Sequence, residues 1–168
     1  RVVYEGHECQ WNGPSWPFST SIILKSMANL LRDYEQSTIT KDDFIQLLRT
    51  YSVSHRRIDE SGKRICWIDE NLNPFTGDWI SRTMLRARGD KIVERGKDYN
   101  HSTFCDHVIS DLVGVRPDFG DILTIDPLIP IDYWDWYCLD NVKYHNKLIT
   151  IVWDKNGKKY NLGKGYFI

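Results

Sequence analysis

Two stretches with helical periodicity, separated by only a few residues, constrain the fold of this chain most strongly. Over residues 18–34, apolar side chains recur at steps of three and four positions, which indicates a helix with one wide apolar face. Pro17 suits the first turn of this helix. Thr40 is placed to cap a second helix, whose apolar face extends to Tyr51. A short linker between two such helices predicts an antiparallel αα-hairpin.

A third helix is predicted further along the chain, after a long basic segment. Residues 79–97 carry six Lys and Arg side chains with little periodicity, and we predict a short irregular helix or a surface loop. Tyr99-Asn100-His101-Ser102 is then expected to open a helix that runs to about Val113, where Gly114 ends it. The formal net charge of −1 argues against a nucleic-acid partner, which would require a basic face.

After Pro117 the pattern changes from helical to extended. Turns are predicted at Asn146-Lys147 and Asn156-Gly157, the second as a tight hairpin. The apolar and aromatic runs that we predict as strands are residues 122–125, 136–139, 148–153 and 166–168. The sequence therefore predicts a mainly α fold with a β appendage, divided into a helical part over residues 1–116 and an antiparallel β-rich segment over residues 117–168.

A polar stretch over residues 67–79 lies between two tryptophans. Pro74 and Gly77 interrupt any helix there, which predicts an ordered loop. Acids and amides flanked by aromatic rings are what a sugar-binding site needs, because hydroxyls require hydrogen-bond partners and pyranose rings pack on aromatic faces. A capped surface turn with two structural tryptophans explains the same residues. Because Asp69 and Glu70 are adjacent, only one of them can face a given pocket if the loop is extended.

Other chemistries have little support in the sequence. Asp69-x-Asn71-x-Asn73 is similar to the start of a calcium loop, but its sixth and twelfth positions are Pro74 and Ile80 instead of Gly and Glu. This excludes an EF-hand and leaves looser calcium binding as the one open cofactor. The four cysteines are far apart and predict buried free thiols, with a disulfide left open. No nucleophile elbow, P-loop or dinucleotide motif is present, and no apolar run approaches the roughly 20 residues that span a membrane.

Three motifs in a fixed order carry a resemblance to a known family. They are Trp11-Asn12-Gly13-Pro14-Ser15-Trp16, then Glu70-Asn71-Leu72-Asn73-Pro74-Phe75-Thr76-Gly77, then Tyr99-Asn100-His101-Ser102. In this order they resemble the C-terminal part of six-hairpin (α/α)6-barrel glycoside hydrolases, in the family 63 and mannosylglycerate-hydrolase-like group. Asn12 stands where the family pattern has Arg, and Leu72 where it has Tyr.

The resemblance implies both a fold and a reaction. It implies a partial (α/α)6 toroid built from the C-terminal helical hairpins, followed by a small antiparallel β segment. Glu70 matches the general base of inverting hydrolysis of the O-glycosidic bonds of an oligosaccharide or glycoside. The general acid, an Asp, belongs to earlier helices of the family that this chain does not contain. The expected partners are a carbohydrate substrate and the remaining N-terminal part of the same protein, and the fragment alone is expected to be inactive.

The resemblance leaves the sugar, the linkage and the anomer open. A periplasmic or secreted bacterial location is a family-level expectation. The alternative function is a non-catalytic carbohydrate-binding or interaction module, in which Glu70 only accepts hydrogen bonds. The candidate substrate-binding residues, some of which also suit a core, are Trp11, Asn12, Trp16, Trp67, Asn71, Asn73, Trp79, Tyr99 and His101.

Overall fold

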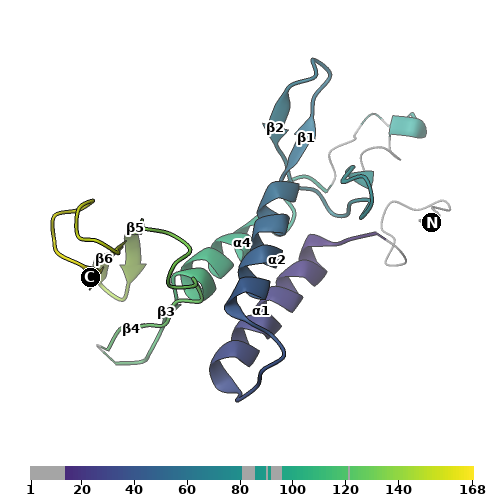
Figure 1. Ribbon diagram of the computed structural model, residues 1–168. Coiled ribbons are helices and arrows are strands. Elements are labelled where there is room, and N and C mark those ends of the chain that lie inside the picture. Colours follow the sequence, from purple (N-terminus) through teal and green to yellow (C-terminus); the bar gives the residue numbers. More distant parts are fainter. Residues whose placement is uncertain (1–13, 81–85, 90, 92–95, 121) are drawn as a thin grey trace.

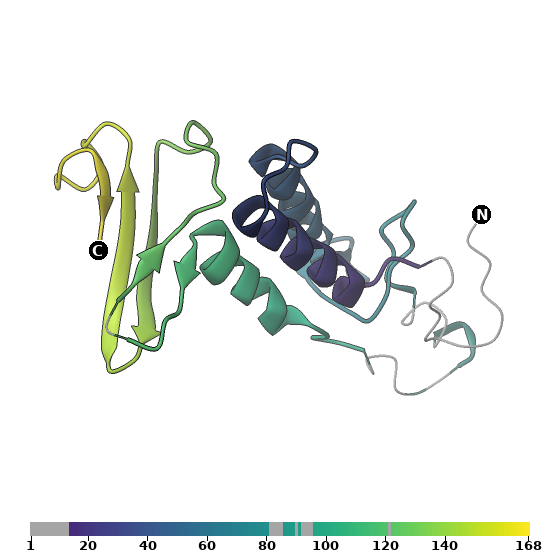
Figure 2. The same ribbon diagram turned by 90° about the horizontal axis from the view of Figure 1, so that it is seen from below.

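The computed structural model describes residues 14–80, 86–89, 91, 96–120 and 122–168 of the 168-residue chain (Figure 1). Helices lie in the middle of the molecule, with a three-stranded sheet at one end and a short hairpin at the other (Figure 2). The elements in chain order are α1 (Pro17–Asp33), α2 (Lys41–Ser54), β1 (Arg56–Ile58), β2 (Arg64–Cys66), α4 (His101–Asp106), the π-helical η1 (His107–Leu112), β3 (Val115–Arg116), β4 (Thr124–Ile125), β5 (Trp136–Tyr144), β6 (Lys147–Asp154) and β7 (Gly165–Phe167).

The predicted pair of helices is confirmed, with ends close to those expected. Pro17 occupies the first turn of α1, where its missing N–H leaves no hydrogen bond unmade. α2 begins with a capping box: the Asp43 N–H donates to Thr40 Oγ1 over 3.2 Å, and the Thr40 N–H donates to Asp43 Oδ2 over 2.8 Å. The two helices lie side by side and bury a common apolar face (Figure 1).

The third predicted helix is present but changes its winding. Asn100, with a φ of 60°, occupies the cap position before α4, and the helix continues from His107 as the π-helix η1. A π-helix inserts extra residues into the hydrogen-bonded turn, a feature that sequence periodicity does not reveal. Gly114 follows with a φ of 84°, as a helix-ending glycine should.

Three small antiparallel sheets make up the β structure of the described residues. β5, β6 and β7 form one sheet at the strand positions predicted, and β3 and β4 form a second. The hairpin of β1 and β2 was not predicted, because its two three-residue strands lie in a charged stretch without a run of apolar residues. The tight hairpin predicted at Asn156-Gly157 is wrong: residues 155–164 form a longer loop, held because Asp154 accepts hydrogen bonds from the backbone N–H groups of Gly157, Lys159 and Tyr160.

The predicted fold class, mainly α with a partial (α/α)6 toroid, is wrong. Helices make up 31% of the structure and strands 23%, and those strands lie in three small antiparallel sheets. The physical reason is that a sheet covers the apolar faces of the helices. One buried cluster joins Leu24 of α1 and Phe44 of α2 to Tyr137 of β5 and Ile151 of β6. Local periodicity predicts an apolar face but not whether a helix or a sheet covers it. The division at residue 116 stays a prediction.

The prediction of buried thiols is wrong for the three cysteines that the structure describes. Cys66, Cys105 and Cys138 are free and exposed. Two of them lie in strands with a solvent-facing side, where alternation along the strand places every second side chain outward. Cys9 lies outside the described residues.

A buried arginine joins the helices to the β structure. The Arg32 side chain, 5% exposed, extends from α1, and its Nη1 donates to Asp111 Oδ1 over 3.1 Å. Its Nη2 donates to the carbonyl oxygens of Ser110, Asp111 and Asp126 over 3.1, 2.8 and 2.7 Å. Its Nε lies 3.3 Å from Asp126 Oδ2, near enough for charge attraction but not aligned as a hydrogen bond. One side chain thus links α1, η1 and the segment after β4.

Replacing Arg32 by Met should therefore destabilise the chain strongly. We expect a loss of about 3–5 kcal/mol in the free energy of unfolding, because Asp111 keeps a buried charge with one cation fewer. Urea denaturation followed by circular dichroism measures this loss. Arg116→Met is the control, because Arg116 is 42% exposed and its ion pairs with Asp33 and Asp126 are long, at 3.7 and 3.5 Å. The control should lose less than about 1 kcal/mol, and equal losses would contradict the assignment.

The buried Asp111 carboxylate should give the fold a specific acid sensitivity. Burial raises the pKa of Asp111, but hydrogen bonds from His107 and Lys25 and the Lys25 charge outweigh it, so the pKa lies below its ordinary 3.8. Because the folded pKa is depressed, the stabilisation is present above pH 3.8 and is lost as the pH falls through the folded pKa. Unfolding free energies measured from pH 7 to pH 2 should fall less steeply below pH 3.8 in Asp111→Asn. Identical slopes in the two proteins would refute this role.

Candidate functional site

The predicted loop over residues 67–79 is ordered and fixed at several points. The Leu72 N–H donates to the Ser15 carbonyl over 2.9 Å, and the Ser15 N–H donates back to the Leu72 carbonyl over 2.8 Å. The Trp67 N–H donates to the His55 carbonyl over 3.1 Å, and the Ile80 N–H donates to the Asn71 carbonyl over 3.0 Å. Backbone bonds therefore hold the loop both to the chain before α1 and to the end of α2.

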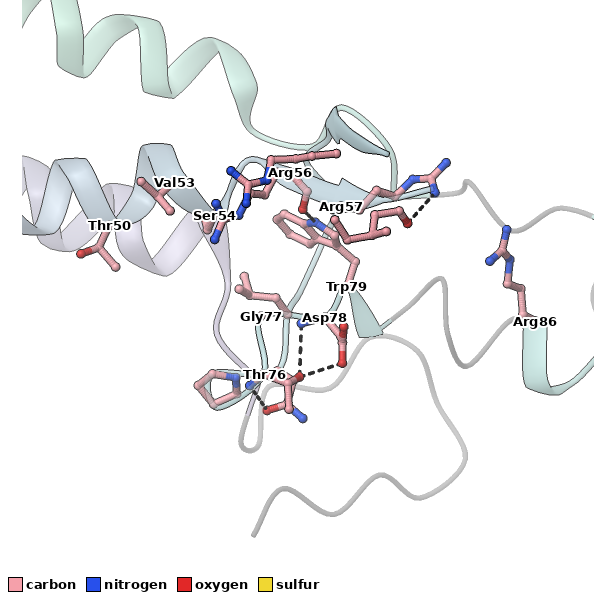
Figure 3. A pocket seen from close by; sticks show the side chains of 15 residues that line it. Thr50, Val53, Ser54, Arg56, Arg57, Thr76, Gly77, Asp78, Trp79 and Arg86 are labelled. Atoms are coloured by element: carbon pink, nitrogen blue, oxygen red, sulfur yellow. Dashed lines mark hydrogen bonds between the residues drawn. The ribbon is translucent and has the colours of Figure 1, made fainter. Parts of the chain in front are cut away.

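The second half of the loop is a tight turn built around Asn73. The Asn73 Oδ1 accepts a hydrogen bond from the Phe75 N–H over 2.9 Å, and the Asn73 carbonyl accepts one from the Gly77 N–H over 2.8 Å. Thr76 Oγ1 donates to Asp78 Oδ2 over 2.8 Å (Figure 3). Gly77 has a φ of 75°, which glycine adopts without strain. The amide oxygen of Asn73 thus shapes the turn itself.

The two adjacent acids of the loop lie in different surroundings, as alternation predicts. Asp69 is fully buried; its Oδ1 accepts from the Glu70 N–H over 2.8 Å, and its Oδ2 lies 3.4 Å from Trp67 Nε1. Glu70 is half-buried. Gly96 packs directly on this pair, because a Cβ added to it would overlap Asp69 Oδ1 and Glu70 Cβ. Asp69 is therefore a structural acid, and Glu70 is the acid of this pair that has an exposed surface.

The candidate aromatic residues are buried against the chain itself. Trp16, Trp67 and Trp79 are 4%, 7% and 4% exposed. The Arg57 guanidinium lies 4.3 Å from the centroid of the Trp67 ring, and Trp79 Nε1 donates to the Arg56 carbonyl over 2.8 Å. These indoles therefore brace the loop, and contact between them and a sugar stays a prediction.

The remaining candidates lie at the loop or before α4. Asn71 is fully buried and Asn73 is half-buried. Tyr99 is half-buried, with its ring edge-on to Trp16 at 6.3 Å between centroids. His101 is the first residue of α4. Trp11 and Asn12 lie outside the described residues.

Asn100, which the sequence analysis did not select as a site residue, fixes the start of α4. Its Nδ2 donates to Ser21 Oγ on α1 over 2.8 Å, and its Oδ1 accepts from Thr103 Oγ1 over 2.9 Å. The available signals were its place in the Tyr99-Asn100-His101-Ser102 motif and its position at the start of the predicted helix. This bond joins the start of α4 to α1.

A cavity of about 560 Å³ lies beside the turn, between the end of α2 and the β1–β2 hairpin (Figure 3). Glu70 is not among its lining residues. Sequence reasoning missed its four arginines, because they come from two separate charged segments and form no motif. The lining residues are Thr50, Val53, Ser54, Arg56, Arg57, Ile58, Arg64, Leu72, Asn73, Pro74, Thr76, Gly77, Asp78, Trp79 and Arg86.

Within the described ranges, no group of three or more His, Cys, Asp or Glu side chains is arranged to hold a metal ion. Among the same residues, no helix has the length and apolar character needed to cross a membrane.

Comparison with known proteins identifies the class and then the family. A sequence profile described as the mannosylglycerate hydrolase MGH1-like glycoside hydrolase domain matches residues 3–102, and one described as the glycosyl hydrolase family 65 C-terminal domain matches residues 116–166. Both profiles describe glycoside hydrolase domains, so the predicted resemblance to glycoside hydrolases is confirmed. Because the first match covers more than half of the chain, the chain belongs to the MGH1-like glycoside hydrolase family.

A solved structure is similar over nearly the whole chain. It is titled "Sialidase", has 39% sequence identity and a TM-score of 0.77, and the alignment covers 94% of this chain. The same alignment covers 13% of the sialidase chain, so this chain spans a small part of the length of the protein that it matches.

The contact between Gly96 and the two acids gives a test of the loop. Gly96→Ala should cost about 1–3 kcal/mol of folding stability, because the new methyl group meets the backbone as well as the side chains of residues 69 and 70. It should also shift the indole N–H resonance of Trp67, which lies against Asp69. Both are measurable on the same sample, by urea denaturation and by ¹H–¹⁵N spectra.

Gly120→Ala is the matched control for this variant. An added Cβ at Gly120 meets only one backbone nitrogen, at 3.9 Å, so stability and the Trp67 resonance should both stay unchanged. A Gly96→Ala protein that behaves like this control would show that the close packing on Asp69 and Glu70 is not a constraint.

Proposed function

We propose that this chain is part of an inverting glycoside hydrolase in which Glu70 is the general base. The observation that carries the proposal is the different burial of two neighbouring acids. Asp69 is fully buried and both of its carboxylate oxygens contact N–H groups of the loop, whereas Glu70 is half-buried on the same rigid backbone. A general base must keep its carboxylate within reach of a water molecule while its backbone is held in place. The half-buried side chain of Glu70 and its held backbone support this role.

The surroundings of Glu70 support a fixed position for this carboxylate. The Glu70 N–H donates to Asp69 Oδ1 over 2.8 Å, and Gly96 packs closely against the Glu70 Cβ. Inversion requires a second carboxyl group about 6.5–9.5 Å away, which protonates the leaving oxygen while the base activates water on the opposite face of the sugar. We assign that acid to a part of the protein outside this chain.

The substrate in this proposal is an oligosaccharide or another O-glycoside. Tyr99 and His101, at the start of α4, and Asn73, in the turn, are proposed to contact it, together with Trp11 and Asn12. The narrower kinship with family 63, and a periplasmic or secreted location, belong to the same proposal. No cofactor is assigned, because the Asp69 and Asn73 side-chain oxygens that would bind calcium accept hydrogen bonds within the loop.

The test is Glu70→Gln in the full-length protein that contains this chain. Gln keeps the size and shape of the side chain but cannot accept the proton of the attacking water. We expect kcat to fall by about 10²–10⁴-fold, the usual contribution of a general base, while the Kd for the glycan stays unchanged. Product analysis by NMR should show inversion at the anomeric carbon in the wild-type protein.

Glu35→Gln is the control, because it makes the same chemical change at an exposed position outside the loop. It should keep full turnover. Unchanged turnover in Glu70→Gln would remove the catalytic assignment and favour the alternative of a glycan-binding module. A product that retains its anomeric configuration would remove the inverting mechanism.

A further inference from the structure

The cavity beside the turn has an unusual concentration of positive charge. Four of its lining residues are arginines: Arg56 and Arg57 from β1, Arg64 from β2, and Arg86. The one carboxylate among its lining residues is Asp78. The whole chain has a formal net charge of −1, so this excess is local and does not follow from the composition. A hollow lined by one sign of charge concentrates ligands of the opposite sign.

The internal contacts of the described residues neutralise only part of this charge. Arg86 Nη2 lies 2.9 Å from Glu60 Oε1, and Arg57 stacks on Trp67 at 4.3 Å. Asp78 is turned towards its own loop, where its Oδ2 accepts a hydrogen bond from Thr76 Oγ1. Among the described residues, Arg56 and Arg64 have no ion-pair partner, and both are exposed. Two guanidinium groups on neighbouring strands are thus available to a ligand.

The positions of Arg56 and Arg64 suit the binding of one anionic group at one wall of the cavity. Arg56 and Arg64 lie near one another across the β1–β2 pair, in which Arg56 is opposite Cys66 and Ile58 is opposite Arg64. The facing wall is the turn of Asn73, Thr76 and Asp78, whose polar groups suit hydroxyls (Figure 3). Guanidinium groups bind planar oxyanions such as carboxylates through two parallel hydrogen bonds.

We propose that this cavity binds an acidic sugar residue, carrying a carboxylate or a sulfate group, of the glycan on which the protein acts. The ligand's anion meets Arg56 and Arg64, and its hydroxyls meet the turn. The volume of about 560 Å³ lies within the range of small-molecule sites. The glycan part of this assignment rests on the proposed function, whereas the anion part rests on the arginines alone. Because Glu70 does not line the cavity, the acidic sugar is not the residue whose bond is hydrolysed.

The test is equilibrium binding to the full-length protein, measured by calorimetry. The probes are digalacturonate, a disulfated digalactose, neutral digalactose and inorganic sulfate. We expect one of the two acidic disaccharides to bind at least tenfold more tightly than the neutral one. The double variant Arg56→Gln/Arg64→Gln should remove that difference and leave the neutral disaccharide unaffected. The identity of the tighter acidic ligand distinguishes a carboxylate from a sulfate.

Two further variants separate the charge from its geometry and from its position. Arg56→Lys/Arg64→Lys keeps both charges but lacks the fork of donors, and should lose part of the preference. Arg49→Gln removes one exposed arginine of α2 that does not line this cavity, and should change nothing. Circular dichroism checks that all variants are folded.

Three results would overturn the proposal. They are equal binding of acidic and neutral disaccharides, an acidic preference that survives in the double Gln variant, and inorganic sulfate binding as tightly as the acidic disaccharides. These results are independent of catalysis, because binding is measured without turnover. If the wild-type protein shows no acidic preference while Glu70→Gln is inactive, this inference alone is overturned. If the acidic preference is present while Glu70→Gln keeps full turnover, the proposed function alone is overturned.

Discussion

The Arg32–Asp111 contact is the interaction on which the arrangement of the rest depends. It fixes the C-terminal half of α1 against η1 and the segment after β4. The N-terminal half of the same helix supports the site, because Ser21 on α1 accepts a hydrogen bond from Asn100, just before α4. A shift of α1 relative to η1 would therefore change both the apolar core and the position of the loop. An arrangement that separates this pair leaves a buried charge without its partner, which costs several kcal/mol.

In the loop over residues 67–79, the burial of each side chain determines its role. Asp69 and Asn71 point inward and are fully buried, and Glu70 between them is half-buried. The buried tryptophans keep water away from the inner layer and so strengthen its hydrogen bonds. This explains how a segment rich in acids and amides stays rigid without regular secondary structure. Rigidity of this kind is what a positioned carboxylate requires.

Local rules predicted those parts of the structure that local interactions determine. The apolar periodicity of residues 18–34, the cap at Thr40 and the interruption at Pro74 each act within a few residues, and each was found from the sequence. The β1–β2 hairpin and the π-helical winding after His107 have no motif in the sequence, and the sheet that covers the helices is distant from them along the chain. Asn156-Gly157 shows the competition directly, because the Asp154 side chain collects the backbone N–H groups of the loop and prevents a tight turn. Alternation predicted different surroundings for Asp69 and Glu70, and the family resemblance selected Glu70, but the arginine-lined cavity is assembled from separate segments and has no sequence motif.

The separation of Glu70 from the cavity implies that, in the proposed function, different parts of the substrate contact different parts of the loop. Asn73 and Asp78 line the cavity whereas Glu70 does not, so a ligand that meets both Glu70 and the cavity must extend past the turn. Binding energy gained at a distance from the reacting bond can be used to hold that bond in position, which raises kcat as well as affinity. The rigid turn between Asn73 and Asp78 transmits this restraint, because it is closed by its own hydrogen bonds. A glycan of at least two residues is therefore the smallest substrate that uses both proposed features of the chain.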